Sequence, residues 1–320
     1  MHQKKARVRR MLFGAFVAAM LIGAQAVAAP SVVATTSFVG DVVAQIGGDE
    51  IRLTVLFPLG ADPHSFEATP ADAVLLARAA VVFAVGAGLE EALEPLLSTA
   101  GVRVVELAEF VPLLSWHGHD HEDDHDEDHH HGDDHHDDED HHHGEHDPHV
   151  WTDPTLVALW THVIQDILTE LAPEHADVFS ARASAYRERL AQLDLWIVQQ
   201  VSRVPREHRV LVSDHHVLGY FAHRYRFRVA GSVVPGLSTL AEPSARELAE
   251  LMATIRALGV RAVFVSTTVN PQLAEQVTRD TGAQLVRLYT ASLSDRSGPA
   301  STYLDMMRYN VTAIVDALRR

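Results

Sequence analysis

Residues 173–204 read PEHADVFSARASAYRERLAQLDLWIVQQVSRV, and this stretch decides how the chain is divided. Its apolar side chains recur at steps of three and four, the spacing of one face of an α-helix; they are Phe179, Ala183, Tyr186, Leu190, Leu193, Ile197 and Val201. The pattern predicts a helix of about eight turns, some 45 Å long, against about three turns for an average globular helix. A coiled-coil dimer is an alternative use of such a helix, but about four heptads with Arg and Gln flanks do not require one. We therefore expect a rigid rod that joins two lobes.

Short β-branched runs alternate with helical patterns on both sides of that rod. Strands are predicted before it at 31–37, 51–57, 80–85 and 102–107, and after it at 209–213, 228–232, 262–266 and 284–289. This alternation predicts parallel sheets flanked by helices. The predicted fold is α/β, with two similar lobes, 29–148 and 205–320, on either side of a helical region, 149–204. A second helix is predicted at 154–171, with an apolar face made of Leu156, Leu159, Val163, Ile167 and Leu171.

Residues 1–28 have the pattern of a secretory signal peptide. A basic segment, 4–10, precedes an apolar run, 11–23, and small residues at 24–28 offer a cleavage site. A membrane anchor is the alternative, but the apolar run is shorter than the roughly 20 residues that a span needs. No cysteine follows the cleavage site, so lipoprotein anchoring is not expected. We expect cleavage of this segment and release of the mature chain.

A stretch rich in histidine and acid follows the first set of strands. Residues 117–149 contain fourteen histidines, and residues 117–147 contain fifteen Asp and Glu but no Lys or Arg. Because this composition cannot bury an apolar core, 117–147 is predicted to be a solvated, mobile loop. Imidazole is a common ligand of transition metals, and carboxylates attract any divalent cation. A histidine tag is an alternative, but the interleaved acids favour a loop that binds metal.

The charge distribution argues against nucleic acid as a partner. The formal net charge is −17, and residues 117–147 account for −15 of it, which leaves −2 for the rest of the chain. Phosphate binding needs clustered Lys and Arg, whereas an acidic loop suits the capture of cations. The chain contains no cysteine. Any zinc site must therefore be built from His, Asp and Glu.

Three histidines stand where open α/β sheets collect ligands, beyond the carboxyl ends of strands. His64 and His215 each follow a predicted strand, and His149 opens the helical region. His64 and His149 both end an Asp-Pro-His tripeptide, in which the proline fixes the backbone and the aspartate is suited to orient the ring. Asp214, beside His215, is a further candidate for this orienting role. Any one of these histidines could be an ordinary surface or capping residue, but the three together predict a metal site.

Several segments carry a resemblance that covers essentially the whole mature chain. They are GADPHSFEATPAD at 60–72, DPHVWTDP at 147–154, SDHHVLGYF at 213–221, LAEPS at 240–244, LYTASLSD at 288–295 and GPASTYLDMMRYN at 298–310. These segments resemble the metal-binding cluster of periplasmic solute-binding proteins from ABC importers. The histidine-rich insert is similar to that of the zinc-specific, ZnuA-like branch. The resemblance implies two α/β lobes joined by one long helix, with the metal in the cleft between them.

The same resemblance implies a set of metal ligands, namely His64, His149 and His215. Manganese-type members have a carboxylate where this chain has His215, and a third imidazole shifts the preference toward zinc. The fourth ligand of the family is often an aspartate near the C-terminus, and this chain has Ala291 at that position. We expect Asp295, four residues on, to take its place if the loop curls back. The alternatives are water or a residue of the histidine-rich loop.

The expected function is that of a monomeric periplasmic receptor that binds Zn²⁺ as cargo. It would deliver the ion to a membrane permease driven by an ATPase and would catalyse no reaction. Two alternatives share the scaffold: a manganese receptor and a metal-dependent adhesion protein. A zinc hydrolase is a further alternative, because three histidines with an open fourth position also serve catalysis. Against it, Glu67 is the only obvious general base near the predicted site.

Overall fold

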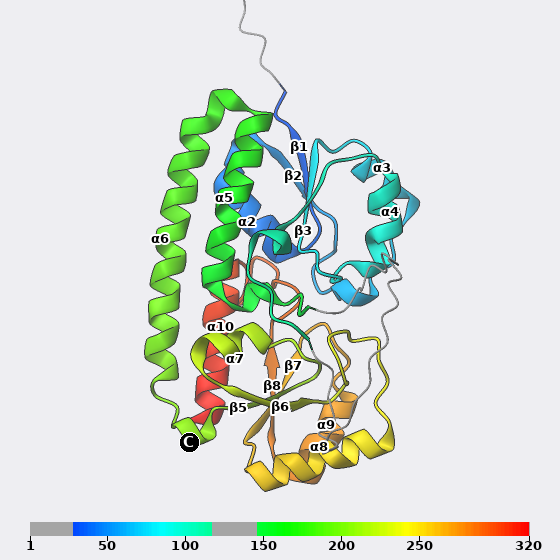
Figure 1. Cartoon of the computed structure of the whole chain (residues 1–320), viewed down its shortest axis with the longest axis vertical. Helices are drawn as coiled ribbons and strands as arrows, with labels where there is room; N and C mark the ends of the chain where they lie inside the picture. The colour runs from blue at the N-terminus through cyan, green and yellow to red at the C-terminus, as the bar shows by residue number, and fades with distance from the viewer. Residues whose placement is uncertain (1–27, 117–145, 320) are drawn as a thin grey trace, which may run out of the picture.

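The computed structural model describes residues 28–116 and 146–319. The predicted signal peptide, apart from its last residue, and almost all of the predicted mobile loop, 117–145, therefore lie outside the described residues. Within the described ranges the chain forms two α/β lobes, one above the other in Figure 1, with long helices along one side. No helix among these residues is both long and apolar enough to cross a bilayer.

The N-terminal lobe is built on a four-stranded parallel sheet. Its strands are β1 (Ser31–Ala34), β2 (Arg52–Val55), β3 (Val81–Ala84) and β4 (Val104–Glu106), in the spatial order β2-β1-β3-β4. The helices of this lobe are α2 (Ser37–Gly47), α3 (Pro70–Leu76) and α4 (Glu94–Thr99). The central strands β1 and β3 are buried along almost their whole length. Such burial is expected for a parallel sheet with both faces covered, and it explains why these strands consist of continuous apolar runs.

The C-terminal lobe repeats this arrangement. Its sheet has the order β6-β5-β7-β8, again all parallel, with strands β5 (Val210–Ser213), β6 (Arg228–Ser232), β7 (Ala262–Ser266) and β8 (Gln284–Leu288). Its helices are α7 (Gly219–Tyr225), α8 (Ala245–Leu258), α9 (Gln272–Thr281) and α10 (Tyr303–Leu318). In each lobe the strand order reverses beside the first strand, which is where an open α/β sheet forms its ligand crevice.

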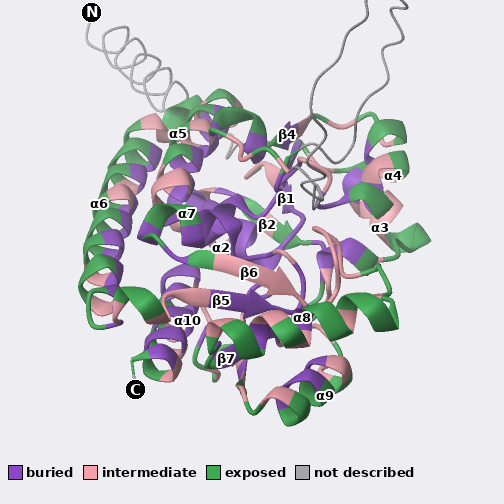
Figure 2. Ribbon diagram, turned by 60° about the horizontal axis from the view of Figure 1, so that its bottom comes forward, coloured by how far each residue is buried: buried purple, intermediate pink, exposed green. Residues whose placement is uncertain are grey.

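Two helices, α5 (Pro154–Leu171) and α6 (Ala176–Val201), connect the lobes through a 3-10 turn at Pro173–His175. Helix α6 has 26 residues, about 39 Å at 1.5 Å per residue. It runs along one side of both lobes (Figure 1) and packs against α2, α5 and α10. All seven apolar positions predicted for it are buried, and Figure 2 shows its exposed residues on the opposite side. The predicted α/β fold of two similar lobes and one long helix is confirmed.

Two local predictions differ from the structure. The buried face of α5 consists of Val157, Trp160, Thr161, Ile164, Ile167 and Leu168, whereas Leu159, predicted to be buried, is 40% exposed. Both stripes have helical spacing, and the observed one fully buries the large indole of Trp160. Strand β1 ends at Ala34 rather than at 37. The chain turns there because the side chain of Thr36 accepts a hydrogen bond from Val39 N and caps α2.

Candidate metal centre

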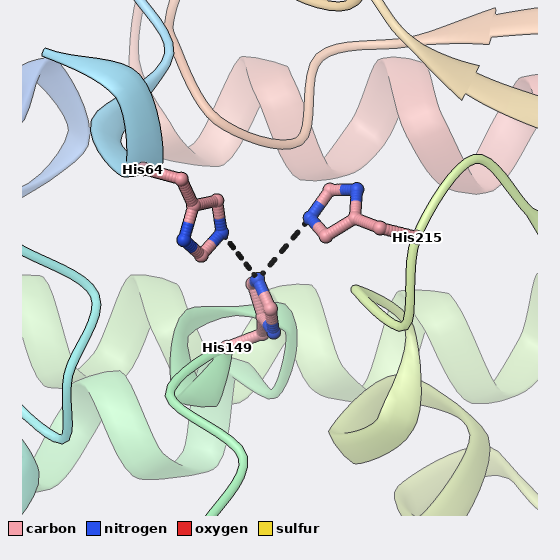
Figure 3. Close-up of side chains that lie close together, drawn as sticks. All are labelled: His64, His149 and His215. Carbon is pink, nitrogen blue, oxygen red and sulfur yellow. Dashed lines mark hydrogen bonds between the residues drawn. The ribbon is translucent and has the colours of Figure 1, made fainter. Parts of the chain in front are cut away.

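Three histidines from separate parts of the chain meet between the lobes (Figure 3). His64 lies in the 3-10 turn Pro63–Ser65 beyond β2, His149 precedes α5, and His215 follows β5. The Nε2 atom of His149 is 3.3 Å from Nε2 of His64 and 3.3 Å from Nε2 of His215. The three side chains offer nitrogens that all lie within 4.8 Å of one another, and the residues are only 8%, 1% and 2% exposed. The three histidines singled out in the sequence therefore converge on one point.

Aspartates fix which nitrogen of two of these rings faces that point. Asp147 Oδ1 accepts a hydrogen bond from Nδ1 of His149 at 2.7 Å, and Asp214 Oδ1 accepts one from Nδ1 of His215 at 3.1 Å. A carboxylate only accepts, so each Nδ1 carries the proton and each Nε2 keeps a lone pair. Lone pairs that face one another repel unless a cation lies between them. In a tetrahedral site with Zn–N bonds of about 2.0–2.1 Å, ligand nitrogens lie about 3.3–3.4 Å apart, which matches both measured separations.

The two Asp-Pro-His tripeptides act in different ways. Asp147 Oδ1 holds the ring of His149 and also accepts from its backbone N at 2.9 Å. Asp62 Oδ1 accepts from the backbone N of His64 at 3.1 Å and caps its turn, while Asp62 Oδ2 accepts from the hydroxyl of Thr239 at 2.5 Å. Thr239 belongs to the other lobe and was not found from the sequence, because no spacing or motif links a threonine in a loop to a site more than 170 positions away.

Asp214 connects His215 to the sheet. In addition to the ring, its Oδ1 accepts from His215 N at 2.9 Å, and its Oδ2 accepts from Ser266 N, at the end of β7, at 2.9 Å. Burial acts to raise the pKa of Asp214, but the attraction and hydrogen bonds of His215 and the bond from Ser266 outweigh it, so the pKa is lowered. Asp214 is therefore a carboxylate at neutral pH and keeps the His215 ring in place.

Burial keeps the imidazoles of His64 and His149 neutral. It lowers the pKa of His64 to about 3, and the nearby rings of His149 and His215 add to the effect. It also lowers the pKa of His149 well below the ordinary value, again with help from His215. Neutral imidazole is the form that binds a metal ion. Burial raises the pKa of Asp147 to about 6, and its Oδ2 has no hydrogen-bond partner among the described atoms.

The structure does not bring Asp295 to the histidines, in contrast to the expectation from the sequence. Its carboxylate is exposed and accepts from Ser297 N, Ser297 Oγ and Gly298 N at 2.8, 2.6 and 3.0 Å. This local turn satisfies the carboxylate with its own backbone, so nothing draws it into the cleft. Ala291, at the position of the family aspartate, is buried and has no ligand atom.

Two tryptophans beside the site pack against neighbouring rings. Trp151 stacks on Phe38, with ring centroids 4.4 Å apart, and its Nε1 donates to the carbonyl of Thr290 at 2.8 Å. Trp116 lies against the ring of His216, also with centroids 4.4 Å apart. His216 is not part of the converging group. These contacts pack the segments that carry His149 and His215 against neighbouring parts of the chain.

A cavity of about 260 Å³, partly open to solvent, lies beside His64. Trp116 and His146, which border residues 117–145 in the sequence, contribute to its wall, and Glu91 adds a carboxyl group. On the side of the C-terminal lobe the wall is formed by Leu237 and Ser238. Of the three converging histidines, His64 borders this cavity.

Comparisons with known proteins agree with this geometry. Residues 32–317 match the family model described as "Zinc-uptake complex component A periplasmic". The chain is 31% identical over 289 residues to the manganese-binding lipoprotein MntA of Halalkalibacterium halodurans, covering 90% of this chain and 88% of that protein. It is 30% identical over 303 residues to the zinc-binding protein TroA of Treponema pallidum, covering 91% and 89% of the two chains.

Solved structures show the same likeness. The periplasmic zinc binding protein TroA from Treponema pallidum superposes with a TM-score of 0.79 at 28% identity, covering 91% of this chain and 99% of that one. A manganese-bound periplasmic metal binding protein from candidatus liberibacter asiaticus gives 0.74 at 26% identity, with coverage of 90% and 99%. The chain therefore belongs to the family of periplasmic A components of zinc-uptake complexes, which are metal-binding, substrate-binding receptors of ABC importers and not enzymes.

Proposed function

We propose that this protein is a zinc receptor that binds Zn²⁺ between its lobes through His64, His149 and His215. The observation that carries the proposal is the convergence of three buried imidazoles, with two separations of 3.3 Å between ligand nitrogens. Two of the rings are already held by carboxylates in the tautomer that binds metal. A site arranged in this way loses little conformational freedom when the ion binds, which favours high affinity.

The donor set favours zinc over manganese. Nitrogen donors in a tetrahedral arrangement suit Zn²⁺, whereas Mn²⁺ prefers carboxylate, carbonyl and water oxygens. Asp295, the carboxylate predicted to complete the set, is engaged by its own loop. We propose that a water molecule from the cavity beside His64 takes the fourth position. The receptor would act as a monomer in the periplasm after removal of residues 1–28, and it would deliver zinc to a permease and its ATPase.

Calorimetric titration with Zn²⁺ tests the ligand assignment. Alanine at position 64, 149 or 215 should remove the tightest binding event, because each substitution takes away a ligand nitrogen. Asp295→Ala is the matched control, since it removes an exposed carboxylate near the same cleft and should leave the tight event intact. A tight event that persists in all three histidine variants, or that disappears in Asp295→Ala, would contradict this ligand set.

A manganese receptor is the second candidate, because several similar proteins are named as manganese-binding. Competition between Zn²⁺ and Mn²⁺ for the metal-free protein separates the two. The three-imidazole set should give zinc a preference of at least about a hundredfold, in line with the usual order of affinities for divalent metals. Equal affinities, or a preference for manganese, would favour the manganese receptor.

A further inference from the structure

One short loop of the C-terminal lobe is hydrogen-bonded to both turns that carry histidines from opposite lobes. This loop, residues 236–240, lies between β6 and α8. At its start, the carbonyl of Gly236 accepts from the backbone N of His216, next to His215, at 2.9 Å. Near its end, Thr239 Oγ1 donates to Asp62 Oδ2, two residues before His64, at 2.5 Å. The 236–240 loop therefore connects the His215 turn to the His64 turn across the cleft.

The hydrogen bond between Thr239 and Asp62 is of a strong type. A hydroxyl that donates to a carboxylate makes a charge-assisted hydrogen bond, which is shorter and stronger than one between neutral groups. Both side chains are half-buried, so water competes only in part. The second oxygen of Asp62 accepts from the backbone N of His64. One carboxylate thus joins Thr239 of one lobe directly to the turn that positions His64 in the other.

Other hydrogen bonds also cross between the lobes, and they differ in where they end. Gly60 N donates to Ser292 Oγ at 2.8 Å, and Leu293 N donates to Ser37 Oγ at 2.9 Å. Neither bond reaches a residue of the Asp-Pro-His tripeptide. They would keep the lobes in register without Thr239, so the loss of Thr239 should act on the His64 turn and not on the fold.

The same loop borders the cavity beside His64. Leu237 and Ser238 line the cavity beside His64, and Thr239 follows them directly. While Thr239 is bonded to Asp62, this wall of the cavity is held against the His64 turn. Separation of the lobes must break the bond and withdraw the wall at the same time.

We propose that Thr239 is a positioning residue that retains the bound metal, because its hydrogen bond to Asp62 latches the 236–240 loop across the cleft. The inference rests on the proposed metal-receptor function. Metal that is held by His64 and His215 pulls the two turns together, and the latch forms when they meet. Release then requires the latch to open before or together with the metal–nitrogen bonds, so the latch slows dissociation. The metal-free protein gains less from it, because no metal–nitrogen bonds then tie the His64 turn to the His215 turn.

The rate at which Zn²⁺ leaves the protein tests this directly. The full mature chain is loaded with one equivalent of Zn²⁺ and mixed with an excess of a chromogenic chelator, and the slowest phase of transfer is followed. Thr239→Val keeps the shape of the side chain but removes the donor. Thr239→Ser keeps the donor and should rescue. Thr312→Val is the matched control, because it makes the same change at an exposed residue of α10, where the hydroxyl donates to the carbonyl of Arg308 at 2.7 Å. The slow phase should be missing in His149→Ala, which would identify it as release from the cleft site.

We expect Thr239→Val to release zinc roughly ten times faster or more, with wild-type rates in Thr239→Ser and Thr312→Val. The melting temperature of the metal-free protein should not change in Thr239→Val. A wild-type rate in Thr239→Val would overturn the latch. So would a loss of melting temperature that is as large in the metal-free variant as in the zinc-loaded variant, each compared with the wild type in the same state. If the wild-type chain itself shows no slow phase, the receptor function fails instead, and the two results cannot be confused.

Discussion

At the scale of single residues, the site depends on two carboxylates that each hold one imidazole proton away from the centre. Asp147 and Asp214 accept from the Nδ1 atoms of His149 and His215. Partners of this kind set the tautomer and orientation of a ligand and raise its basicity, and their loss commonly costs 10–100-fold in metal affinity. What surrounds each carboxylate therefore matters as much as the ligands themselves.

Gly219, at the start of α7, leaves the space that Asp147 occupies. A Cβ at this position would lie closer than 3.0 Å to Asp147 Oδ2, a separation that real Cβ atoms essentially never show. Gly219→Ala should displace the carboxylate, free the ring of His149 and weaken zinc binding about tenfold or more. Calorimetric titration measures the change.

Gly40→Ala is the control for that substitution. A Cβ there would also be too close to a neighbour, the side chain of Val55, but the contact lies in the apolar N-terminal lobe. It should leave zinc affinity unchanged, whatever its effect on stability. Equal losses of affinity in both variants would mean that overpacking alone, and not displacement of Asp147, weakens the site.

The buried His64 predicts how the stability of the metal-free protein changes with pH. Its pKa is about 3 in the folded state, against the ordinary value of 6.5 in the unfolded chain. Between these values the unfolded state binds a proton that the folded state does not, so the free energy of unfolding decreases as the pH falls below 6.5. The slope from this one group approaches about 1.4 kcal/mol per pH unit.

His64→Gln removes that titration while keeping a polar side chain of similar size. In urea unfolding of the chelator-treated protein between pH 7 and pH 5, the variant should lose stability less steeply than the wild type. Parallel curves for the two proteins would show that His64 is not held neutral by burial.

At the scale of elements, the two lobes share one feature. In each lobe a single carboxylate accepts hydrogen bonds at or just beyond the ends of the two central strands and so links them. In the C-terminal lobe this is Asp214, which follows β5 and accepts from Ser266 N at the end of β7. In the N-terminal lobe it is Glu90, whose Oε1 accepts from Thr35 Oγ1, beyond β1, at 2.6 Å and from Val85 N, beyond β3, at 2.9 Å. The two lobes therefore repeat both the strand order and this link between strand ends. Of the two carboxylates, Asp214 also contacts one of the three converging histidines, His215.

Helix α6 offers a direct test of what holds the lobes together. Leu190 is 1% exposed on its inner face, and Leu195 is 64% exposed on its outer face. Leu190→Ala should lower the free energy of unfolding by about 2–5 kcal/mol, because it leaves a cavity in the core. Leu195→Ala, the same change one and a half turns away, should stay within about 0.5 kcal/mol of the wild type. Chemical denaturation compares them, and similar losses would show that α6 is not packed as described.

At the scale of the whole molecule, the described residues on either side of the histidine-rich insert lie next to each other. Ser115 and His146, close to its two ends, form an antiparallel bridge, and Asp147 N donates to the carbonyl of Leu114 at 2.9 Å. Replacement of residues 118–145 by two glycines would leave a four-residue hairpin loop between the bridged residues, a length that hairpins readily accept. The ends of the insert already lie where a short connection needs them.

This replacement should leave one tight zinc site and abolish several weak ones in a calorimetric titration. The tight site belongs to His64, His149 and His215, and the weak ones belong to the imidazoles and carboxylates that are removed. The wild-type chain under the same conditions is the reference. Disappearance of the tight event, in a variant that still unfolds cooperatively, would mean that the insert supplies part of the cleft site.

The sequence by itself determined the periodic features of this protein. The eight short apolar runs and the apolar stripe on α6 could be predicted, because a parallel sheet covered on both faces and an amphipathic helix impose regular spacing. The histidines could be singled out because of where they stand relative to the predicted strands and helices. On α5 the same kind of spacing was ambiguous. Two stripes fit the helical period, and only the packing around Trp160 selects the buried one.

Tertiary structure alone decided the contacts that carry no period. Asp295 has a suitable side chain at a suitable place in the sequence, yet the hydrogen bonds of its own turn hold it in solvent. Thr239 lies in an unremarkable loop, yet it donates to Asp62 across the cleft. Periodicity records which face of an element is buried, whereas the meeting of two loops depends on how the lobes are placed relative to each other, and that placement results from packing over the whole molecule.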